Sequence, residues 1–396
     1  MERYLAGLEV PREIQQNRFD TILRGAHDTE FARDHGLDRV RTLDDFRSAV
    51  PIRSYEEHRP WLERIWNGES RVLTREPVIH LLETSGTTGE PKWLPVTRSW
   101  ARSVADAQAL WILGIVEEHE AVARGSALTM VSPAEKERSP GGIPVGSNTG
   151  RMHGSQPWWV RLRYPVPYEV VCLCPHDLQL YTVLRFALQA PIRSITTANP
   201  STILLLQRRL SEWREALQED LKAGTLRHGP AAALDGRTRR RLERKLKKLP
   251  PSQEWSLVKL WDLAVVNCWT SGPAAYFAER LRDDLGGVAV REVGITASEG
   301  YFAIPAQSGS GCVAWTHGHL LEFVGGDGRP RWAWELETGE QVRMVVTTEA
   351  GLYRYDLEDV VEVDGWCGRT PVLRFVGKAG RFLNSTGERV HANQVV

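Results

Sequence analysis

Residues 84–92, with the sequence TSGTTGEPK, combine the residue types that bind a phosphate group. Glycine permits backbone conformations in which successive N–H groups point at one anion, hydroxyl side chains add donors, and a lysine adds positive charge. The segment supplies all three kinds of group: Thr84, Ser85, Gly86, Thr87, Thr88, Gly89 and Lys92. It differs from the nucleotide-kinase loop, because only two residues separate its glycines and Trp93 follows the lysine. By itself the pattern predicts either a phosphate-binding loop or a polar surface turn.

The segments around this loop must position it. Residues 1–50 are predicted to be mainly helical, with a stop at Gly36 and with Thr42 as an N-cap three residues before Asp45. From about residue 72 to 311, short apolar runs alternate with helical patterns, which favours α/β sheets with crossover helices. The predicted strands include 78–82, 126–132, 168–174, 263–269 and 288–296, and the predicted helices include 99–123 and 178–190. After about residue 312 the pattern predicts an all-β section, a meander or a barrel.

Composition narrows the class of protein. The chain has 396 residues, with 50 Lys plus Arg balanced by 50 Asp plus Glu, so no global field favours nucleic acid or an anionic membrane. Apolar runs are too short for a membrane span, and the N-terminus lacks a signal-peptide core. Its 5 cysteines are scattered, which favours reduced thiols in a cytoplasmic protein. These features predict a soluble cytoplasmic protein that binds neither nucleic acid nor membrane.

One segment carries a strong local charge. Residues 228–251 contain a run of Arg and Lys, with Leu242, Leu246 and Leu249 at helical spacing. A basic face could bind nucleic acid or a phosphorylated partner, but a solvated helix with one apolar stripe explains the run with fewer assumptions. Two other constellations, the thiols of 172–174 and the histidines of 317–319 near Cys312, lack the regular spacing of a metal site.

The segment at 84–92 resembles the phosphate-binding loop of adenylate-forming enzymes, the superfamily of acyl-CoA synthetases, peptide-synthetase adenylation domains and luciferases. More closely, the chain resembles the Gretchen Hagen (auxin-responsive promoter) family of acyl acid amido synthetases. The segments that carry this resemblance are VPIRSYEEHRPWLERIWNGES (50–70), GGIPVGSNTGRM (141–152) and TTANPSTILLLQRRL (196–210). It extends from about residue 15 to the last residue.

The resemblance implies a fold and a domain organisation. The fold is expected to be α/β, the large N-terminal domain of an adenylate-forming enzyme, with helix-flanked β-sheets and a β-barrel-like C-terminal section. That domain would span 1–376, comprising the helical start at 1–50, the α/β sheets at about 72–311 and the mainly β section at about 312–376. Residues 377–396 resemble the superfamily's hinge, after which the family has a small C-terminal domain that we expect to be absent here.

The resemblance also implies a set of ATP-site residues. Ser271, Gly272 and Pro273, in the TSGPA segment, match the loop that lies along adenine. In ITASEG (295–300), Thr296, Ala297 and Ser298 match the α-phosphate segment and Glu299 the Mg²⁺ ligand; a carboxylate suits Mg²⁺ beside phosphates. Asp359 matches the ribose-binding aspartate, and Lys378 belongs to the basic hinge region. Lys92, Ser298 and Glu299 would form the catalytic set.

Each of these matches has a plainer alternative. A serine–glutamate pair such as 298–299 is often an ordinary helix N-cap, and an aspartate such as Asp359 is often a turn or edge-strand residue. The chain also departs from the family pattern. Ile295 and Thr296 stand where the family often has Tyr-Gly, so an aromatic residue that stacks on adenine is missing, and Glu358 stands where glycine usually precedes the ribose aspartate.

Together these features predict ATP-dependent, Mg²⁺-assisted activation of a carboxylic acid as acyl-AMP, followed by transfer to an amine or amino acid. The acyl pocket is expected to include Trp111, Ile143, Val145 and Trp269. Two alternatives remain open. The acyl group could pass to a thiol and give a thioester, or the chain could be a non-catalytic nucleotide-binding protein.

Overall fold

The computed structural model describes residues 2–85, 91–252, 254–306, 311–379, 382–385 and 388–391. The N-terminal helices are α1 (Glu2–Gly7), α2 (Pro11–Ala26), α3 (Glu30–Asp34), α4 (Leu43–Ala49) and α5 (Tyr55–Trp66). The predicted cap is confirmed, because Thr42 and Asp45 form a reciprocal capping box at α4. Ser54 and Glu57 do the same at α5, and Gly36 ends the α3 region in the left-handed conformation.

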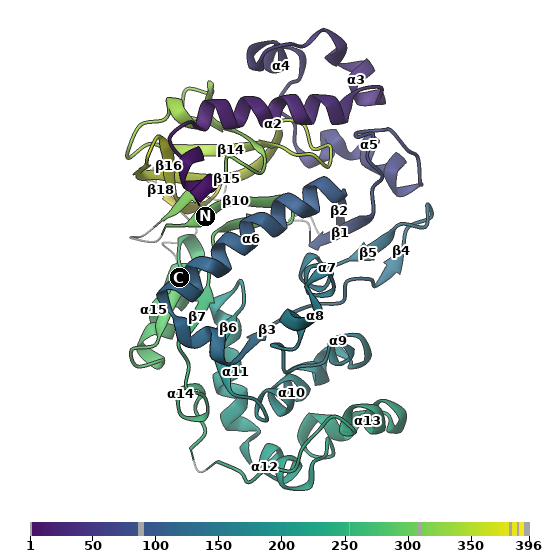
Figure 1. Cartoon of the computed structure of the whole chain (residues 1–396), viewed down its shortest axis with the longest axis vertical. Coiled ribbons are helices and arrows are strands. Elements are labelled where there is room, and N and C mark those ends of the chain that lie inside the picture. The colour runs from purple at the N-terminus through teal and green to yellow at the C-terminus, as the bar shows by residue number, and fades with distance from the viewer. Residues whose placement is uncertain are drawn as a thin grey trace.

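A large antiparallel sheet packs against these helices. Its strands, in spatial order, are β13 (Pro330–Trp332), β12 (Leu320–Val324), β14 (Gln341–Thr347), β15 (Tyr355–Cys367), β16 (Thr370–Lys378), β11 (Cys312–Ala314), β10 (Gly300–Pro305) and β9 (Ile295–Ala297). Figure 1 shows α2 lying along this sheet. The predicted β section is confirmed, although its sheet also takes in strands that precede residue 312.

A parallel sheet lies in the other half of the molecule (Figure 1). Its strands are β3 (Ser126–Thr129), β6 (Ile192–Thr196), β7 (Val265–Cys268) and β8 (Ala289–Glu292), paired in chain order. The intervening helices are α7 (Asn148–Ser155), α8 (Trp158–Arg161), α9 (Tyr168–Leu173), α10 (His176–Ala187), α11 (Pro200–Glu212), α12 (Arg214–Ala223), α13 (Gly236–Glu243), α14 (Leu257–Leu260) and α15 (Ala275–Asp284). Parallel strands require such crossovers, so the predicted α/β alternation is confirmed.

A mixed sheet completes the frame. It contains β2 (Pro91–Val96), β1 (His80–Ser85), β5 (Pro144–Gly146) and β4 (Glu137–Arg138), in that spatial order. The long helix α6 (Arg98–Glu118) follows β2 and begins at Thr97, whose side chain accepts a hydrogen bond from Trp100 N. Near the C-terminus, β17 (Phe382–Ser385) pairs with β18 (Glu388–His391). In the described part of the chain, no helix combines the length and the apolar character needed to cross a membrane.

The strand prediction for residues 168–174 is wrong, because this segment forms helix α9. Pro167 precedes the helix with φ of −60°, which suits a helix start. Val170 and Cys174, four residues apart, are both buried in the core around the parallel sheet, as helical spacing requires. The β-branched pair of valines gave a local strand signal that this packing overrides. Cys172 is exposed, so the two thiols do not share a strand face.

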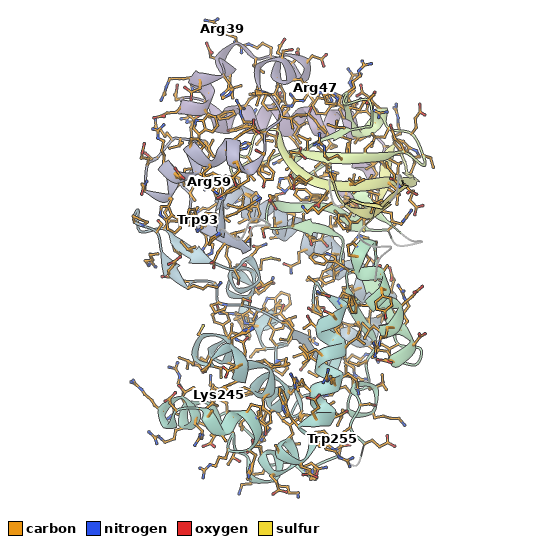
Figure 2. The ribbon with its side chains drawn as sticks, turned by 180° about the vertical axis from the view of Figure 1, so that it is seen from behind. Arg39, Arg47, Arg59, Trp93, Lys245 and Trp255 are labelled. Atoms are coloured by element: carbon orange, nitrogen blue, oxygen red, sulfur yellow. The ribbon has the colours of Figure 1, made fainter. Side chains whose placement is uncertain are left out.

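The basic segment is a surface element with an apolar stripe. Leu242 is fully buried on α13, and Leu246 and Leu249 pack against the same core. This agrees with the predicted stripe, although α13 ends at Glu243, so the last two leucines lie beyond the helix. Figure 2 shows Lys245 in the lower half of the molecule, far from Arg47, which lies beside the antiparallel sheet.

Candidate active site

The carboxyl ends of the parallel strands all lie at one edge of their sheet. Loops leave β6, β7 and β8 there and present Asn199, Ser271 and Gly294 to a common cavity. Open α/β sheets bind ligands outside the carboxyl ends of their strands, because short loops and free backbone groups gather at that edge. The fold therefore places a binding site where three consecutive crossover units end.

The cavity has a volume of about 730 Å³, which is the size of a ligand site rather than of a packing defect. Its walls come from the antiparallel, parallel and mixed sheets, from the start of α5 and from α15. The lining residues that the sequence predicted are Thr84, Lys92, Trp269, Ser271, Pro273, Thr296, Ala297, Ser298, Glu299, Asp359 and Lys378. Residues far apart in the chain thus meet at one place.

Ser298 and Glu299 form the turn of a tight β-hairpin. Ala297 of β9 pairs directly with Gly300 of β10, which leaves these two residues at the tip facing the cavity. The alternative that they cap a helix is therefore wrong. Trp100 fixes the hairpin, since its indole Nε1 donates a 2.8 Å hydrogen bond to the Glu299 carbonyl oxygen.

The carboxyl group of Glu299 lies in an unusual electrostatic environment. Burial raises its pKa above the ordinary value, and the Asp359 carboxylate acts in the same direction. Lys378 and a hydrogen bond donated by the Tyr355 hydroxyl oppose the rise. A perturbed carboxyl group in a cleft, with identifiable partners, is a typical feature of catalytic and ligand-binding sites.

Asp359 lies on β15 opposite Lys378 on β16. Lys378 Nζ lies 2.8 Å from Asp359 Oδ1 and donates a 2.7 Å hydrogen bond to the carbonyl oxygen of Leu357. Only 6% of Asp359 is exposed, and this burial raises its pKa although Lys378 acts in the opposite direction. The alternative of a simple turn or edge-strand residue is wrong, because β15 lies between β14 and β16 inside the sheet.

Glu358 precedes this aspartate with a φ of 60°, in the left-handed region. Glycine adopts that conformation without a steric penalty, whereas a residue with a Cβ is disfavoured by about 1–2 kcal/mol. The backbone geometry therefore explains why a glycine suits this position, as the family resemblance implies. The Glu358 N–H donates a 2.9 Å hydrogen bond to Asp356 Oδ1, which helps to hold this irregular stretch of β15.

The described ends of the phosphate-loop segment also face the cavity. Thr84 on β1 pairs with Lys92 on β2, and both line the cavity. Lys92 Nζ lies 5.0 Å from the ring centroid of Tyr55, a cation–π distance. Ser85 pairs with Pro91 through its backbone. The remaining predicted residues of the loop, Gly86, Thr87, Thr88 and Gly89, lie outside the described residues.

The predicted adenine loop follows β7. Ser271 and Pro273 line the cavity, and Gly272 between them has a φ of 58°. A Cβ on Gly272 would lie 2.6 Å from the ring of Phe375, so both the conformation and the close approach require glycine. Trp269, at the start of the loop, also lines the cavity, and its assignment to the acyl pocket stays a prediction.

Three other predicted acyl-pocket residues do not line this cavity. Trp111 is buried, and its indole donates a 3.3 Å hydrogen bond to the carbonyl oxygen of Glu292. Val145 is fully buried on β5 beside Leu81, and Ile143 packs against the same core. These positions are corrected to core positions, because their side chains are taken up by packing between sheets and helices.

Sequence reasoning missed several aromatic and acidic side chains of the cavity. They are Tyr55, Phe277, Glu292, Tyr355 and Phe375. Tyr55 lies inside the segment 50–70 that carries the family resemblance, and Tyr355 lies four residues before Asp359, which that resemblance also singled out. That association was the available signal. Phe277, on α15, offers no comparable signal in the sequence.

The fold is that of the adenylate-forming enzymes. The structure of 2-hydroxyisobutyryl-CoA ligase in an open conformation, in complex with 2-HIB-AMP and CoA, matches 96% of this chain and 77% of its own with a TM-score of 0.56 and 15% identity. A closer structural match is AtGH3.15 acyl acid amido synthetase in complex with 2,4-DB. It has a TM-score of 0.85 and 20% identity, covering 99% of this chain and 72% of that one.

The chain belongs to the GH3 family. Residues 2–290 match the GH3 family N-terminal domain and residues 315–378 match the GH3 family central domain. Its relatives include indole-3-acetic acid-amido synthetase GH3.4 of Arabidopsis thaliana, 23% identical over 96% of this chain and 69% of the relative. Jasmonoyl-L-amino acid synthetase JAR4 of Nicotiana attenuata is 22% identical over 94% of this chain and 70% of the relative. The family predicted from the sequence is confirmed.

Proposed function

We propose that this chain activates a carboxylic acid with ATP as an acyl-AMP and transfers the acyl group to an amine, in particular an amino acid. One observation carries the proposal. Segments from β1–β2, the β7 loop, the β9–β10 hairpin and β15–β16 converge on one cavity of about 730 Å³. Names of relatives such as GH3.4 and JAR4 describe acid–amino acid ligation, which supports amide formation as the overall reaction.

Different walls of the cavity bind different parts of the nucleotide. The loop at 270–274 borders the base, and Asp359 accepts hydrogen bonds from the ribose hydroxyls. Lys378, 2.8 Å from Asp359, favours the ionised form of that carboxylate and places a positive charge near the sugar and α-phosphate. Lys92, at the end of the segment 84–92, provides positive charge for the β- and γ-phosphates.

Glu299 suits a Mg²⁺ ion. It is a cavity-lining carboxylate at the tip of a tight hairpin, and Mg²⁺ prefers one or two carboxylates combined with substrate phosphate oxygens. The rise in the Glu299 pKa fits this assignment, since a nearby cation would restore the ionised form that burial disfavours. When bound, the ion supplies charge neutralisation at the phosphates.

The chemistry then follows from positioning and charge. A carboxylate oxygen of the acid attacks the α-phosphorus, the bond to the β-phosphate oxygen breaks, and pyrophosphate leaves with that electron pair. Lys92 stabilises the charge that develops on the leaving group, and Ser298 donates a hydrogen bond to the α-phosphate. In the second step the amine nitrogen attacks the acyl carbon, AMP leaves, and the nitrogen loses a proton.

An acid-dependent trapping assay tests this function. The protein is incubated with ATP, Mg²⁺, hydroxylamine and separate aryl, indolyl, fatty and amino acids, and AMP and hydroxamates are measured by mass spectrometry. A hydroxamate from one acid class is expected, with a loss of at least about 100-fold in Lys92→Ala. Lys245→Ala, on the far surface, is the matched control and should retain activity.

Parallel reactions identify the acceptor. Amino acids and CoA replace hydroxylamine, and the product is identified as an amide or as a thioester. Amide formation supports the proposal, whereas a thioester with CoA would redirect it to an acyl-CoA ligase. ATP binding without AMP formation, for every acid tested, would refute catalysis by this chain.

A further inference from the structure

The carboxylate of Glu292 is a centre of hydrogen bonds at the edge of the cavity. Glu292 is the last residue of β8 and lies opposite Cys268, the last residue of β7. The loops that follow both strands turn back toward it. Glu292 Oε2 accepts hydrogen bonds from Thr270 N at 2.8 Å, Thr270 Oγ1 at 2.9 Å and Ser271 Oγ at 3.1 Å.

The other carboxylate oxygen binds the loop that follows β8. Glu292 Oε1 accepts hydrogen bonds from Val293 N at 3.0 Å and from Gly294 N at 3.3 Å. Within the described residues, one carboxylate therefore receives five hydrogen bonds from two loops. An ionised carboxylate offers about four lone-pair positions, so no acceptor capacity remains for a ligand.

Both loops border the cavity, and the loop after β8 is sterically constrained there. Ser271 and Gly294 line it, and Gly294 has a φ of 107°. A Cβ at Gly294 would lie 2.6 Å from the carbonyl oxygen of Ala303. The loop after β8 leads directly into β9 and the hairpin that carries Glu299. The position of Glu292 therefore determines the separation between the base loop and the hairpin.

We propose that Glu292 is a positioning residue for nucleotide binding, which holds the loop at 270–271 and the loop at 293–294 in their binding arrangement. This inference rests on the proposed ATP site. Glu292 lines the cavity, but its carboxylate is occupied by the two loops, so it contributes to the site through them. It acts by satisfying backbone N–H groups that would otherwise point into the cavity and change the shape of the base pocket.

Substitution by glutamine provides a sharp test. Glu292→Gln preserves size but replaces one acceptor oxygen with an NH₂ group, which would face donors from Thr270 or Val293 and Gly294. One loop must then move. We expect the ATP KM to rise at least 10-fold, with the KM for the acid and kcat changed less than about 3-fold. Glu292→Asp retains both acceptors on a shorter side chain and should recover part of the ATP affinity.

The matched control is Glu118→Gln. Glu118 forms an ion pair with Arg291, the neighbour of Glu292 on β8, with Arg291 NH2 2.8 Å from Glu118 Oε1. This substitution removes a carboxylate charge next to the same strand but leaves the cavity loops untouched. The ATP KM of Glu118→Gln should equal that of the wild type. Calorimetric ATP binding, measured alongside turnover, reports the same ranking without dependence on the acid.

The outcomes separate this inference from the proposed function. A wild-type protein that forms no acyl-AMP refutes the function, whatever the variants do. An active wild type with an unchanged ATP KM in Glu292→Gln refutes the positioning role alone. If Glu292→Gln does not fold, Thr270→Val, which removes one of the donors to Glu292, takes its place. A 2–3-fold rise in the ATP KM of Thr270→Val is then expected, and an unchanged KM overturns the inference.

Discussion

Replacing Glu299 with glutamine separates the charge of this side chain from its shape. A glutamine oxygen can still accept the hydrogen bond from the Tyr355 hydroxyl, so packing at the hairpin tip is retained. What disappears is a negative charge that burial and the nearby Asp359 carboxylate both disfavour. The variant should therefore be more stable than the wild type and at the same time inactive in adenylation.

The direction of the pKa shift gives the sign of the stability change, and its size is taken from comparable substitutions. Relief of unfavourable interactions in a functional site typically gains about 0.5–2 kcal/mol, and we expect about 1 kcal/mol at pH 8. For a protein of this size the gain corresponds to an increase of about 1 °C in Tm. Loss of the proposed Mg²⁺ ligand should lower pyrophosphate release by about 100- to 1000-fold.

The pH dependence distinguishes charge from packing. The folded-state pKa of Glu299 is raised, so its ionised form destabilises the fold at pH values above that folded pKa. At pH values below the ordinary carboxyl pKa, Glu299 is protonated in both folded and unfolded states and costs nothing. The stability gain of Glu299→Gln should therefore be largest at neutral and alkaline pH and vanish as the pH falls below about 4.5.

Calorimetric unfolding of both proteins without nucleotide or metal, between pH 4 and 8, provides the measurement. Glu279→Gln is the control, since Glu279 is exposed on α15 and its charge should have little effect. Equal stability of Glu299→Gln and the wild type at pH 8 would refute the electrostatic reasoning. A gain that persists unchanged at pH 4 would show that packing rather than charge is responsible.

Three further substitutions test the frame around the site. Glu322→Gln should lower the free energy of unfolding in urea by about 3–5 kcal/mol, because it leaves the buried Arg354 guanidinium without its counter-charge. In the wild type, Arg354 donates two 3.0 Å hydrogen bonds to Glu322. A loss below about 1 kcal/mol would contradict this. Gly300→Ala should lower the free energy of unfolding by about 1–3 kcal/mol and impair adenylation, since the new Cβ would overlap the His319 ring. Pyrophosphate release at the wild-type rate would contradict this prediction. Leu242→Ala should lower the free energy of thermal unfolding by about 2–5 kcal/mol, because Leu242 is buried in the apolar stripe of α13. An unchanged stability would favour the interpretation of this segment as a basic binding face.

Local motifs were predictable because their chemistry is contained in a few adjacent residues. The sequence places Ser298 beside Glu299, and the structure adds that a hairpin rather than a helix presents them. Likewise, Asp359 was identified in the sequence, but its pairing with Lys378 depends on the register between β15 and β16. Such register is determined by the burial of whole strands, which one motif cannot reveal.

Residues that act across the cavity were harder to predict. Trp111 was expected in the acyl pocket, yet its indole donates a hydrogen bond to the Glu292 carbonyl oxygen inside the core. Glu292 itself has no motif around it, and its importance depends on two loops brought together by parallel pairing of β7 and β8. Aromatic character alone does not tell which side of a helix or strand faces a ligand.

The family-typical segment at 50–70 acquires a physical explanation from its contact with β15. Arg53 N donates to the Arg354 carbonyl oxygen at 3.0 Å, and Asp356 N donates to the Arg53 carbonyl oxygen at 2.8 Å. These bonds hold the start of α5 against the start of β15, so Tyr55 and Tyr355 enter the cavity from adjacent backbones. Asp359 lies four residues after Tyr355 on the same strand. A shift of the α5 start would therefore move the aromatic wall beside Lys92 and the strand that carries Asp359 together, which is why a segment remote from residues 84–92 contributes to the same cavity.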